Sequence, residues 1–358
     1  MKFRRQAVRV TDALHPRGHT VALASNEVSR HAVRLVLVDR ATSEVRAVPF
    51  GELPQLLRAG DLVVVNDAAT LPALIAGTTS TGAVIELRLS APIAGSRIYG
   101  VVFGAGDYHM RTEDRPAPPP IAAGDRLEFG GIATIVESIA GRRVVLAAQL
   151  SDDELWHALY AAGKPVQYAH RSELLPLYSV QTAYAARPWA VEMPSAGRAL
   201  TWDVLLGLRR AGIHIATLTH AAGLSSTGDD ALDRALPWPE RYEIPQRTLD
   251  ELRAAKARGN RVIAIGTTVV RALESAALAA ELDESELRAG SGIATLRLDP
   301  AYHPRVIDSL VSGLHVPGES HFELLSAFAP RALLVKAIAL AAQHGMSGHE
   351  LGDACLVI

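Results

Sequence analysis

The chain has 358 residues, 49% of them hydrophobic and 21% charged, which is enough length and apolar content for two domains with sizeable cores. A formal net charge of −2 excludes an overall basic excess of the kind common in nucleic-acid binders, although a local basic patch remains compatible with it. The single cysteine, Cys355, excludes an intrachain disulfide or a Cys-cluster zinc site; with no signal peptide or membrane-length apolar run visible, we expect a cytoplasmic protein without membrane contact.

The first part of the chain predicts a hairpin and one strand of a larger sheet. Residues 31–50, "HAVRLVLVDRATSEVRAVPF", alternate apolar and polar positions around an Arg-Ala-Thr-Ser turn, which is typical of two antiparallel strands. Residues 50–66 then predict a short helix, a glycine stop and a buried strand that ends in Asn66 and Asp67.

Residues 72–150 have a different character. They contain short strand patterns separated by glycine-containing turns, and helical periodicity is absent. Residues 111–125 form a proline-rich stretch that predicts a surface connector. This pattern is typical of a small all-β barrel or sandwich, so we expect residues 72–150 to form an inserted β-barrel domain.

Helical patterns return at residue 151. Ser151 and Glu154 have the spacing of a capping box, and residues 248–277 read as helix, glycine stop, apolar strand, turn and helix. Helices that alternate with continuous apolar strands indicate a sheet with parallel strands. The predicted fold class is therefore α/β, a mixed-sheet α/β domain with an inserted small all-β barrel domain; the α/β part is discontinuous and comprises residues 1–70 and 151–358.

Polar residues stand where three of the predicted parallel strands end. Ligands bind at the carboxyl ends of strands in such sheets, because the loops there converge on one cleft. We therefore expect one site to gather the ends Asn66-Asp67, Thr219-His220 and Gly266-Thr267-Thr268.

The Gly-Thr-Thr turn has two interpretations. Gly266 permits a tight turn, and the free N–H groups and dipole of the following helix favour a carboxylate or phosphate, with Arg271 one turn further on. Alternatively, a threonine simply caps the helix, and Arg271 and Glu274 form an ordinary solvated pair.

Histidines provide further candidates for chemistry. His220 follows a strand in a glycine-containing loop, where an imidazole either moves a proton or has a structural role. His315 precedes a Pro-Gly turn, and His321 follows six residues later, but a pair of histidines poor in carboxylates argues against a metal site. Ser195 lies in a tight turn and is interpreted as a cap, because its context is not G-x-S-x-G.

Several motifs spread along nearly the whole chain resemble one family. They include "RVIAIGTTVVRALESAA", "LRAGDLVVVND", "AVEMPSAG", "YHPRVIDSL", "LHVPGES" and the ending "LGDACLVI". On these motifs the chain resembles the S-adenosylmethionine:tRNA ribosyltransferase-isomerases of queuosine biosynthesis. The architecture of that family, an α/β domain with an inserted β-barrel, agrees with the fold predicted above.

The resemblance implies a reaction without a metal, in which S-adenosylmethionine is the co-substrate. Its ribosyl group would pass to 7-aminomethyl-7-deazaguanine in a tRNA and rearrange to give epoxyqueuosine, adenine and methionine. A monomer with tRNA as its partner is expected. Carried over to the matching positions, the resemblance assigns proton transfer or ribose contacts to His220, Glu240 and His315, the methionyl or phosphate subsite to Gly266, Thr267, Thr268 and Arg271, and a sugar or base edge to Asn66 and Asp67.

The chain departs from the family pattern in the expected cleft. Ala69 and Leu74 stand where the family has arginines, and Ala199 and Leu200 replace a histidine and a phenylalanine. With fewer basic residues, we expect a lower affinity for tRNA, since phosphate contacts supply most of the affinity for nucleic acids. Two alternatives therefore stay open: a paralogue that uses S-adenosylmethionine on a small-molecule or other acceptor, and a non-catalytic binder on the same scaffold.

Overall fold

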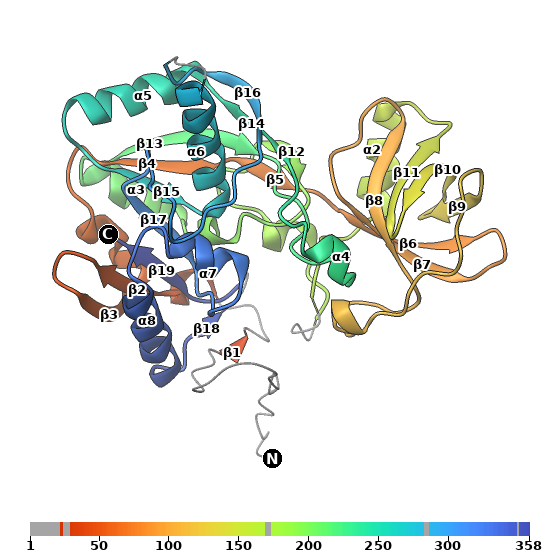
Figure 1. Cartoon of the computed structure of the whole chain (residues 1–358), viewed down its shortest axis with the longest axis horizontal. Helices are drawn as coiled ribbons and strands as arrows, with labels where there is room; N and C mark the ends of the chain where they lie inside the picture. Colours follow the sequence, from red (N-terminus) through yellow and green to blue (C-terminus); the bar gives the residue numbers. More distant parts are fainter. Residues whose placement is uncertain (1–21, 24–28, 169–172, 283–285, 349–350) are drawn as a thin grey trace.

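A nine-stranded mixed sheet is the centre of the larger lobe of the molecule (Figure 1). The computed structural model describes residues 22–23, 29–168, 173–282, 286–348 and 351–358. The middle of the sheet is parallel, as predicted, because β4 pairs in parallel with both neighbours and β15 does the same with β17. In sheet order, the strands are β16 (Gly290–Ala294), β14 (Glu240–Ile244), β13 (His214–His220), β4 (Leu62–Asn66), β15 (Val262–Ile265), β17 (Ser309–Gly313), β19 (Ala354–Val357), β2 (Arg34–Asp39) and β3 (Glu44–Pro49).

Helices cover both faces of this sheet. Leu252, Val269 and Leu334 pack on one face, and Leu53 and Leu205 pack on the other. The central strands are therefore buried on both sides, which explains their continuous apolar sequences. The helices on the first face are α5 (Gln246–Ala257), α6 (Thr267–Leu282), α7 (Ser320–Leu325) and α8 (Arg331–Gln343); those on the second are α1 (Leu53–Leu56) and α3 (Trp202–Arg210).

The smaller lobe is a closed, six-stranded antiparallel barrel with its own hydrophobic core. Gly77 is required where two strands come close together, because a Cβ at this position would overlap the Glu128 carbonyl oxygen. The expectation of an inserted all-β barrel is confirmed. Its strands are β6 (Leu74–Thr79), β7 (Val84–Leu89), β8 (Arg97–Phe103), β9 (Arg126–Phe129), β10 (Ile132–Ala140) and β11 (Arg143–Ala148).

Two paired strands connect the lobes. The chain enters the barrel after β5 (Ala68–Thr70) and returns through β12 (Arg187–Ala190), and these two strands pair in parallel. Helix α2 (Asp152–Ala162) begins with the predicted capping box and packs on the barrel core. The domain boundary expected near residue 150 stays a prediction; α2 begins beyond that residue but packs on the barrel core.

Two strands of the sheet were not predicted, and they change the place of His220. β14 and β16 extend the sheet beyond β13, and β14 pairs antiparallel with β13 through His220 and Tyr242. This pairing lengthens β13, so His220 is the last residue of a strand and not part of the following loop. The sequence prediction ended the strand too early because polar Thr219 and His220 interrupt its apolar pattern.

The remaining described elements are short. β1 (Ala22–Leu23) pairs with β18 (Ser347–Gly348), and α4 (Asp230–Asp233) lies in the connection between β13 and β14. Among the described residues, no helix has the length and apolar content needed to cross a membrane. The expectation of no signal peptide concerns residues 1–16, which lie outside the described residues.

Candidate active site

The predicted site residues lie along one edge of the sheet, which faces the barrel lobe (Figure 1). β13, β4, β15 and β17 are consecutive neighbours, so their carboxyl ends place His220, Asn66, Gly266 and Gly313 in a row. His315 follows Gly313 two residues later. With strands about 4.8 Å apart, the row from β13 to β17 is about 14 Å long, which is large enough for an extended nucleoside-sized ligand.

His220 and Glu240 form a buried pair at one end of this row. His220 is fully buried, and its Nε2 lies 3.4 Å from Oε2 of Glu240, whose side chain is 10% exposed. Burial, assisted by the charge of Arg271, lowers the pKa of His220 to about 3, so the imidazole is neutral at pH 7. Neither ring nitrogen makes a well-aligned hydrogen bond within the described part of the chain.

Glu240 is fixed from two further sides. The backbone N–H of Gly223 donates to its Oε1 at 2.6 Å, and the guanidinium of Arg271 forms an ion pair with its Oε2. Gly223 lies in the connection after His220, and Arg271 comes from α6. Contacts with His220, Gly223 and Arg271 therefore hold this carboxylate in one position. A general acid or base needs such a fixed position to transfer a proton.

Arg271 and Glu274 are not the solvated pair that one interpretation suggested; both are buried. Apart from its ion pair with Glu240, Arg271 donates to three backbone carbonyls, and Glu274 accepts from the Tyr302 hydroxyl and from the backbone. Burial lowers the pKa of Arg271 to about 10, which leaves it charged at pH 7. These contacts favour a positioning role toward Glu240. The carbonyls belong to Trp238, Ala294 and Leu296, and the backbone donors to Glu274 to Arg305, Val306 and Ile307.

Asn66 joins the histidine to the Gly-Thr-Thr turn. Its Nδ2 donates to the His220 carbonyl at 3.0 Å and to the Thr268 hydroxyl at 3.3 Å, and its Oδ1 accepts from the N–H groups of His220 and Ala68. Four hydrogen bonds use the whole capacity of a carboxamide. Asn66 is thus placed to hold other residues of the site in register.

The Gly266-Thr267-Thr268 turn forms the start of α6. Gly266 has φ +92°, a conformation that favours glycine, and both threonines are only half-buried. The 16-residue helix begins at Thr267, so its free N–H groups and the positive end of its dipole lie at the sheet edge beside Asn66. This arrangement suits a carboxylate or phosphate.

Asp67 lies beside Thr219 rather than beside the histidine. The Thr219 hydroxyl donates to its Oδ1 at 2.6 Å. Burial raises the pKa of Asp67, and the negative charge of Asp67, together with burial, raises the pKa of the Tyr184 hydroxyl. Asp67 is thus next to the site, but in the described part of the chain it makes no hydrogen bond or ion pair with Glu240 or His220.

His315 belongs to a separate cluster at the far end of the row. Its Nδ1 lies 3.1 Å from Oε2 of Glu319, and its ring stacks on His321 with centroids 4.6 Å apart. Within the described ranges, no group of three or more His, Cys, Asp or Glu side chains is arranged to hold a metal ion. Ser195 begins a short 3-10 turn and lines a cavity of about 10 Å³ with Gly313 and Asp353.

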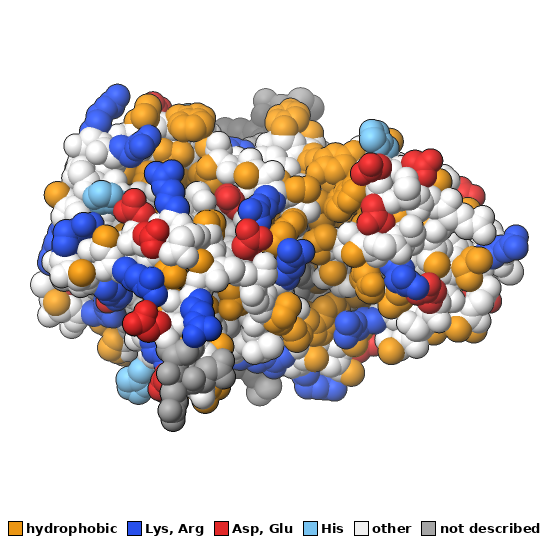
Figure 2. Space-filling model, turned by 90° about the horizontal axis from the view of Figure 1, so that it is seen from above, with side chains coloured by type: hydrophobic (Ala, Val, Ile, Leu, Met, Phe, Trp, Pro, Cys, Tyr) orange, Lys and Arg blue, Asp and Glu red, His pale blue; other side chains and the backbone are white. Residues whose placement is uncertain are grey.

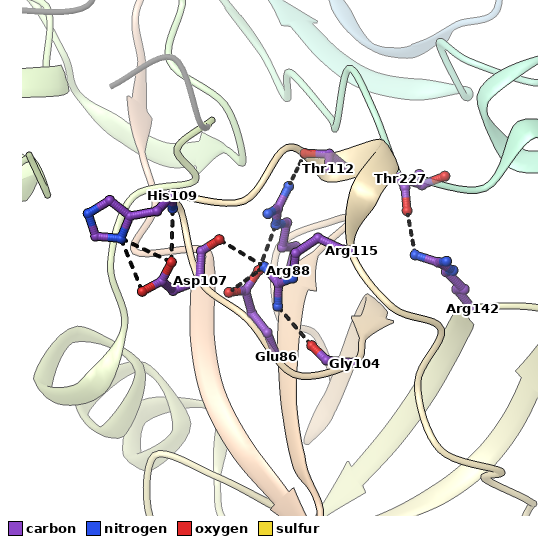
Figure 3. A network of polar contacts seen from close by, with 9 residues as sticks. All are labelled: Glu86, Arg88, Gly104, Asp107, His109, Thr112, Arg115, Arg142 and Thr227. Carbon is purple, nitrogen blue, oxygen red and sulfur yellow. Dashed lines mark hydrogen bonds and ion pairs between the residues drawn. The ribbon is translucent and has the colours of Figure 1, made fainter. Parts of the chain in front are cut away.

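A buried ionic network at the end of the barrel was not predicted (Figure 3). Arg88 donates to Glu86 at 2.9 Å and to the Thr112 hydroxyl at 3.1 Å, and Arg115 contacts both oxygens of Glu86 at 3.1 Å. Arg88 also lies over the Phe103 ring, 4.3 Å from its centroid. Glu86 and Arg88 alternate in the β7 sequence "VIELRL" with Ile85, Leu87 and Leu89 of the barrel core, so they lie on the outer face of the strand, where the segment that carries Thr112 and Arg115 covers them. Two charged residues on the outer face of a strand gave no signal of burial.

The connection between His220 and Glu240 rests on this end of the barrel. The backbone of Gly228 packs on the Thr112 carbonyl so closely that a Cβ would overlap it. Arg142 donates to the Thr227 carbonyl at 3.4 Å (Figure 3). Arg143 lies over the Trp238 ring, 4.4 Å from its centroid. The barrel thus supports the segment that carries both residues of the buried pair.

Together, these features form a site that fits proton transfer next to an anion. A neutral imidazole lies next to a tightly held carboxyl group, and a helix N-terminus lies two strands away. The barrel lobe supports the segment that carries the buried pair, through its contacts with Thr227, Gly228 and Trp238.

Comparisons with known proteins agree with this architecture. The family model described as "Queuosine biosynthesis protein" matches residues 18–357. The S-adenosylmethionine:tRNA ribosyltransferase-isomerase of Trichlorobacter lovleyi is 32% identical over 92% of this chain and 94% of its own, and that of Mesorhizobium japonicum is 33% identical over 94% of both.

A solved structure supports the fold as well. The crystal structure of the S-adenosylmethionine tRNA ribosyltransferase from Thermotoga maritima superposes with a TM-score of 0.50, at 22% identity over 94% of this chain and 96% of that one. The match in sequence runs through the sheet, the barrel and the edge where the site residues gather. The chain belongs to the queuosine biosynthesis protein family.

Proposed function

We propose that this chain is an S-adenosylmethionine:tRNA ribosyltransferase-isomerase. It transfers the ribosyl group of S-adenosylmethionine to 7-aminomethyl-7-deazaguanine in a tRNA and isomerises it, giving epoxyqueuosine, adenine and methionine. The observation that carries the proposal is identity above 30% with enzymes of this name over more than nine-tenths of both chains. The sequence similarity to these enzymes extends over both the α/β lobe and the barrel lobe.

Glu240 is the proposed proton acceptor. The reaction needs a base that removes a proton from the carbon next to the sulfonium. Of the buried pair, only Glu240 is reached by solvent, and its carboxylate is anchored on one side by Arg271. His220, neutral and 3.4 Å away, orients this carboxylate and can share its proton.

The methionyl carboxylate is proposed to bind at the start of α6. Gly266, Thr267 and Thr268 provide free N–H groups, hydroxyls and the helix dipole there. Asn66 holds this turn in register with His220, and Arg271 positions Glu240. Asp67 and His315 lie at the margins of the site, where they are proposed to contact sugar or base.

The test is a reaction with a tRNA that carries 7-aminomethyl-7-deazaguanine. Release of adenine and methionine and the mass of the modified nucleoside are measured for the wild type, for Glu240→Gln, and for Glu44→Gln as a control, an exposed carboxylate on β3 at the opposite side of the sheet. We expect turnover by the wild type and the control, and a loss of at least about a hundredfold in Glu240→Gln. Binding of S-adenosylmethionine without turnover would favour the paralogue with another acceptor.

A further inference from the structure

Two arginines beside Glu240 are held in place by tryptophan rings. Arg241 lies over the Trp189 ring, 4.0 Å from its centroid, and Arg143 lies over the Trp238 ring, 4.4 Å from its centroid. Trp238 and Arg241 flank Glu240 in the sequence. The Trp238–Arg241 backbone spans at most about 11 Å, and the side chains of Glu240 and Arg241, consecutive residues of β14, point to opposite faces of the sheet.

Both guanidiniums are available for a ligand. Arg143 and Arg241 are exposed, and among the described residues neither guanidinium has an ion-pair or hydrogen-bond partner. By contrast, Arg187, which also lies near Trp189, is paired with Glu243 at 2.7 Å. An arginine that is already fixed on an indole loses little freedom when it binds a phosphate or stacks on a base.

The two arginines come from different lobes. Arg143 begins β11 of the barrel, and Arg241 lies on β14 of the sheet. Figure 2 shows Lys and Arg side chains among the hydrophobic ones that gather where the lobes meet. A ligand held by both arginines would therefore bridge the lobes next to Glu240.

Burial of the reacting pair restricts what this ligand can be. His220 has no exposed surface and Glu240 very little, so a base that reacts there must be unstacked from its neighbours. Unstacked bases occur in single-stranded loops, and such bases stack on guanidinium planes as well as on aromatic rings.

We propose that Arg143 and Arg241, each held on a tryptophan, form the surface that binds the single-stranded loop of the RNA acceptor. This inference rests on the proposed function for the identity of the acceptor, but the binding surface itself can be tested without turnover. The loop would lie across the lobe junction, with the guanidiniums stacking on bases and pairing with phosphates on both sides of the reacting nucleotide.

The test measures binding of a fluorescein-labelled 17-nucleotide RNA stem-loop to the full chain by anisotropy. Arg143→Ala, Arg241→Ala and the double variant are compared with Arg331→Ala, which removes another arginine that lies over an aromatic ring, 5.0 Å from Phe322, on α8. We expect about tenfold weaker binding for each single variant, roughly a hundredfold for the double variant, and no change for Arg331→Ala. Arg241→Lys should recover only part of the affinity, because lysine restores charge but not the stacking plane.

Salt dependence and competitors complete the test. Each lost phosphate contact should reduce the slope of log affinity against log salt by about 0.7. A blunt RNA duplex or a polyglutamate peptide that binds as tightly as the stem-loop would overturn the proposal, as would unchanged affinity of the double variant.

Turnover separates this inference from the proposed function. If the wild type modifies tRNA while the double variant keeps the same KM for tRNA, the surface is wrong and the function stands. If the wild type binds the stem-loop through both arginines without ribosyl transfer, the surface stands and the function is wrong. Isothermal titration with S-adenosylmethionine should give the same affinity for the double variant and the wild type.

Discussion

The Arg271 guanidinium of α6 forms a buried ion pair with the Glu240 carboxylate of β14. The pair joins an inner helix to a strand near the edge of the sheet, and it places a fixed negative charge next to a neutral histidine. Arg271, which follows the Gly-Thr-Thr turn, therefore positions the carboxylate of Glu240 from a distant segment. The N-terminus of α6 does not need Arg271 and is proposed to bind an anion.

Replacing Arg271 by methionine should destabilise the protein strongly. The variant leaves the Glu240 carboxylate and three carbonyls without their donor in a buried position, which costs about 3–5 kcal/mol of unfolding free energy. Urea unfolding at pH 7 measures this loss. Arg331→Ala, which breaks the exposed pair with Glu323, should change stability by less than about 1 kcal/mol. Similar losses in the two variants would contradict a buried, supporting role for Arg271.

The stability of the protein should depend on pH through His220. Its pKa is about 3 when folded and about 6.5 when unfolded, so the unfolded chain binds more protons between these values and stability falls as pH decreases through this window. Between pH 7 and pH 5 this contributes about 2 kcal/mol. Urea unfolding at both pH values should show that the wild type loses about this much more than His220→Gln. An equal loss in both proteins would mean that His220 is not held neutral.

Gly228 tests the contact between the barrel and the segment that links the buried pair. Gly228→Ala should cost about 2 kcal/mol more than Gly259→Ala. Both glycines have positive φ, +65° and +71°, but a Cβ at Gly228 would overlap the Thr112 carbonyl, whereas a Cβ at Gly259 meets nothing within 4 Å. The shared backbone strain cancels in the comparison. Thermal unfolding of the two variants measures the difference, and Gly228→Ala should also slow turnover because its segment carries Glu240.

The barrel network should tolerate the loss of one arginine better than the loss of its carboxylate. Glu86→Gln leaves Arg88 and Arg115 as two buried cations, with an expected cost of about 3–5 kcal/mol. Arg88→Met leaves Arg115 in its two contacts with Glu86, so we expect a smaller loss. Urea unfolding measures the loss of unfolding free energy in each variant. A larger loss for Arg88→Met than for Glu86→Gln would contradict this order and would show that the packing and hydrogen bonds of Arg88 contribute more to stability than the Glu86 charge.

The architecture could be predicted because local patterns and long-range pairing agree in it. The apolar run ending at Asn66 and the capping box of Ser151 both appear in the structure at the expected places. β14 was missed because "ERYEI" is half polar and becomes a strand only by pairing with β13 on one side and β16 on the other.

The site was predictable as a row of strand ends but not as a set of contacts. Asn66, His220 and Gly266 could be placed together because parallel strands end at the same edge. The partnership of Arg271 with Glu240 could not be predicted, because it depends on the path of a connection that rests on the other lobe. The buried Glu86–Arg88–Arg115 network could not be predicted for a similar reason, because the β7 sequence alone does not show that a distant segment covers the outer face of this strand.

The pairing of β5 with β12 has a mechanical consequence. A single linker lets two lobes swivel freely, but here both crossings between the lobes are hydrogen-bonded to each other as one ribbon. Such a ribbon resists twisting and bends more easily in one direction. The two paired crossings therefore hold the barrel in one orientation over this edge of the sheet, which favours the contact of Arg143 with Trp238.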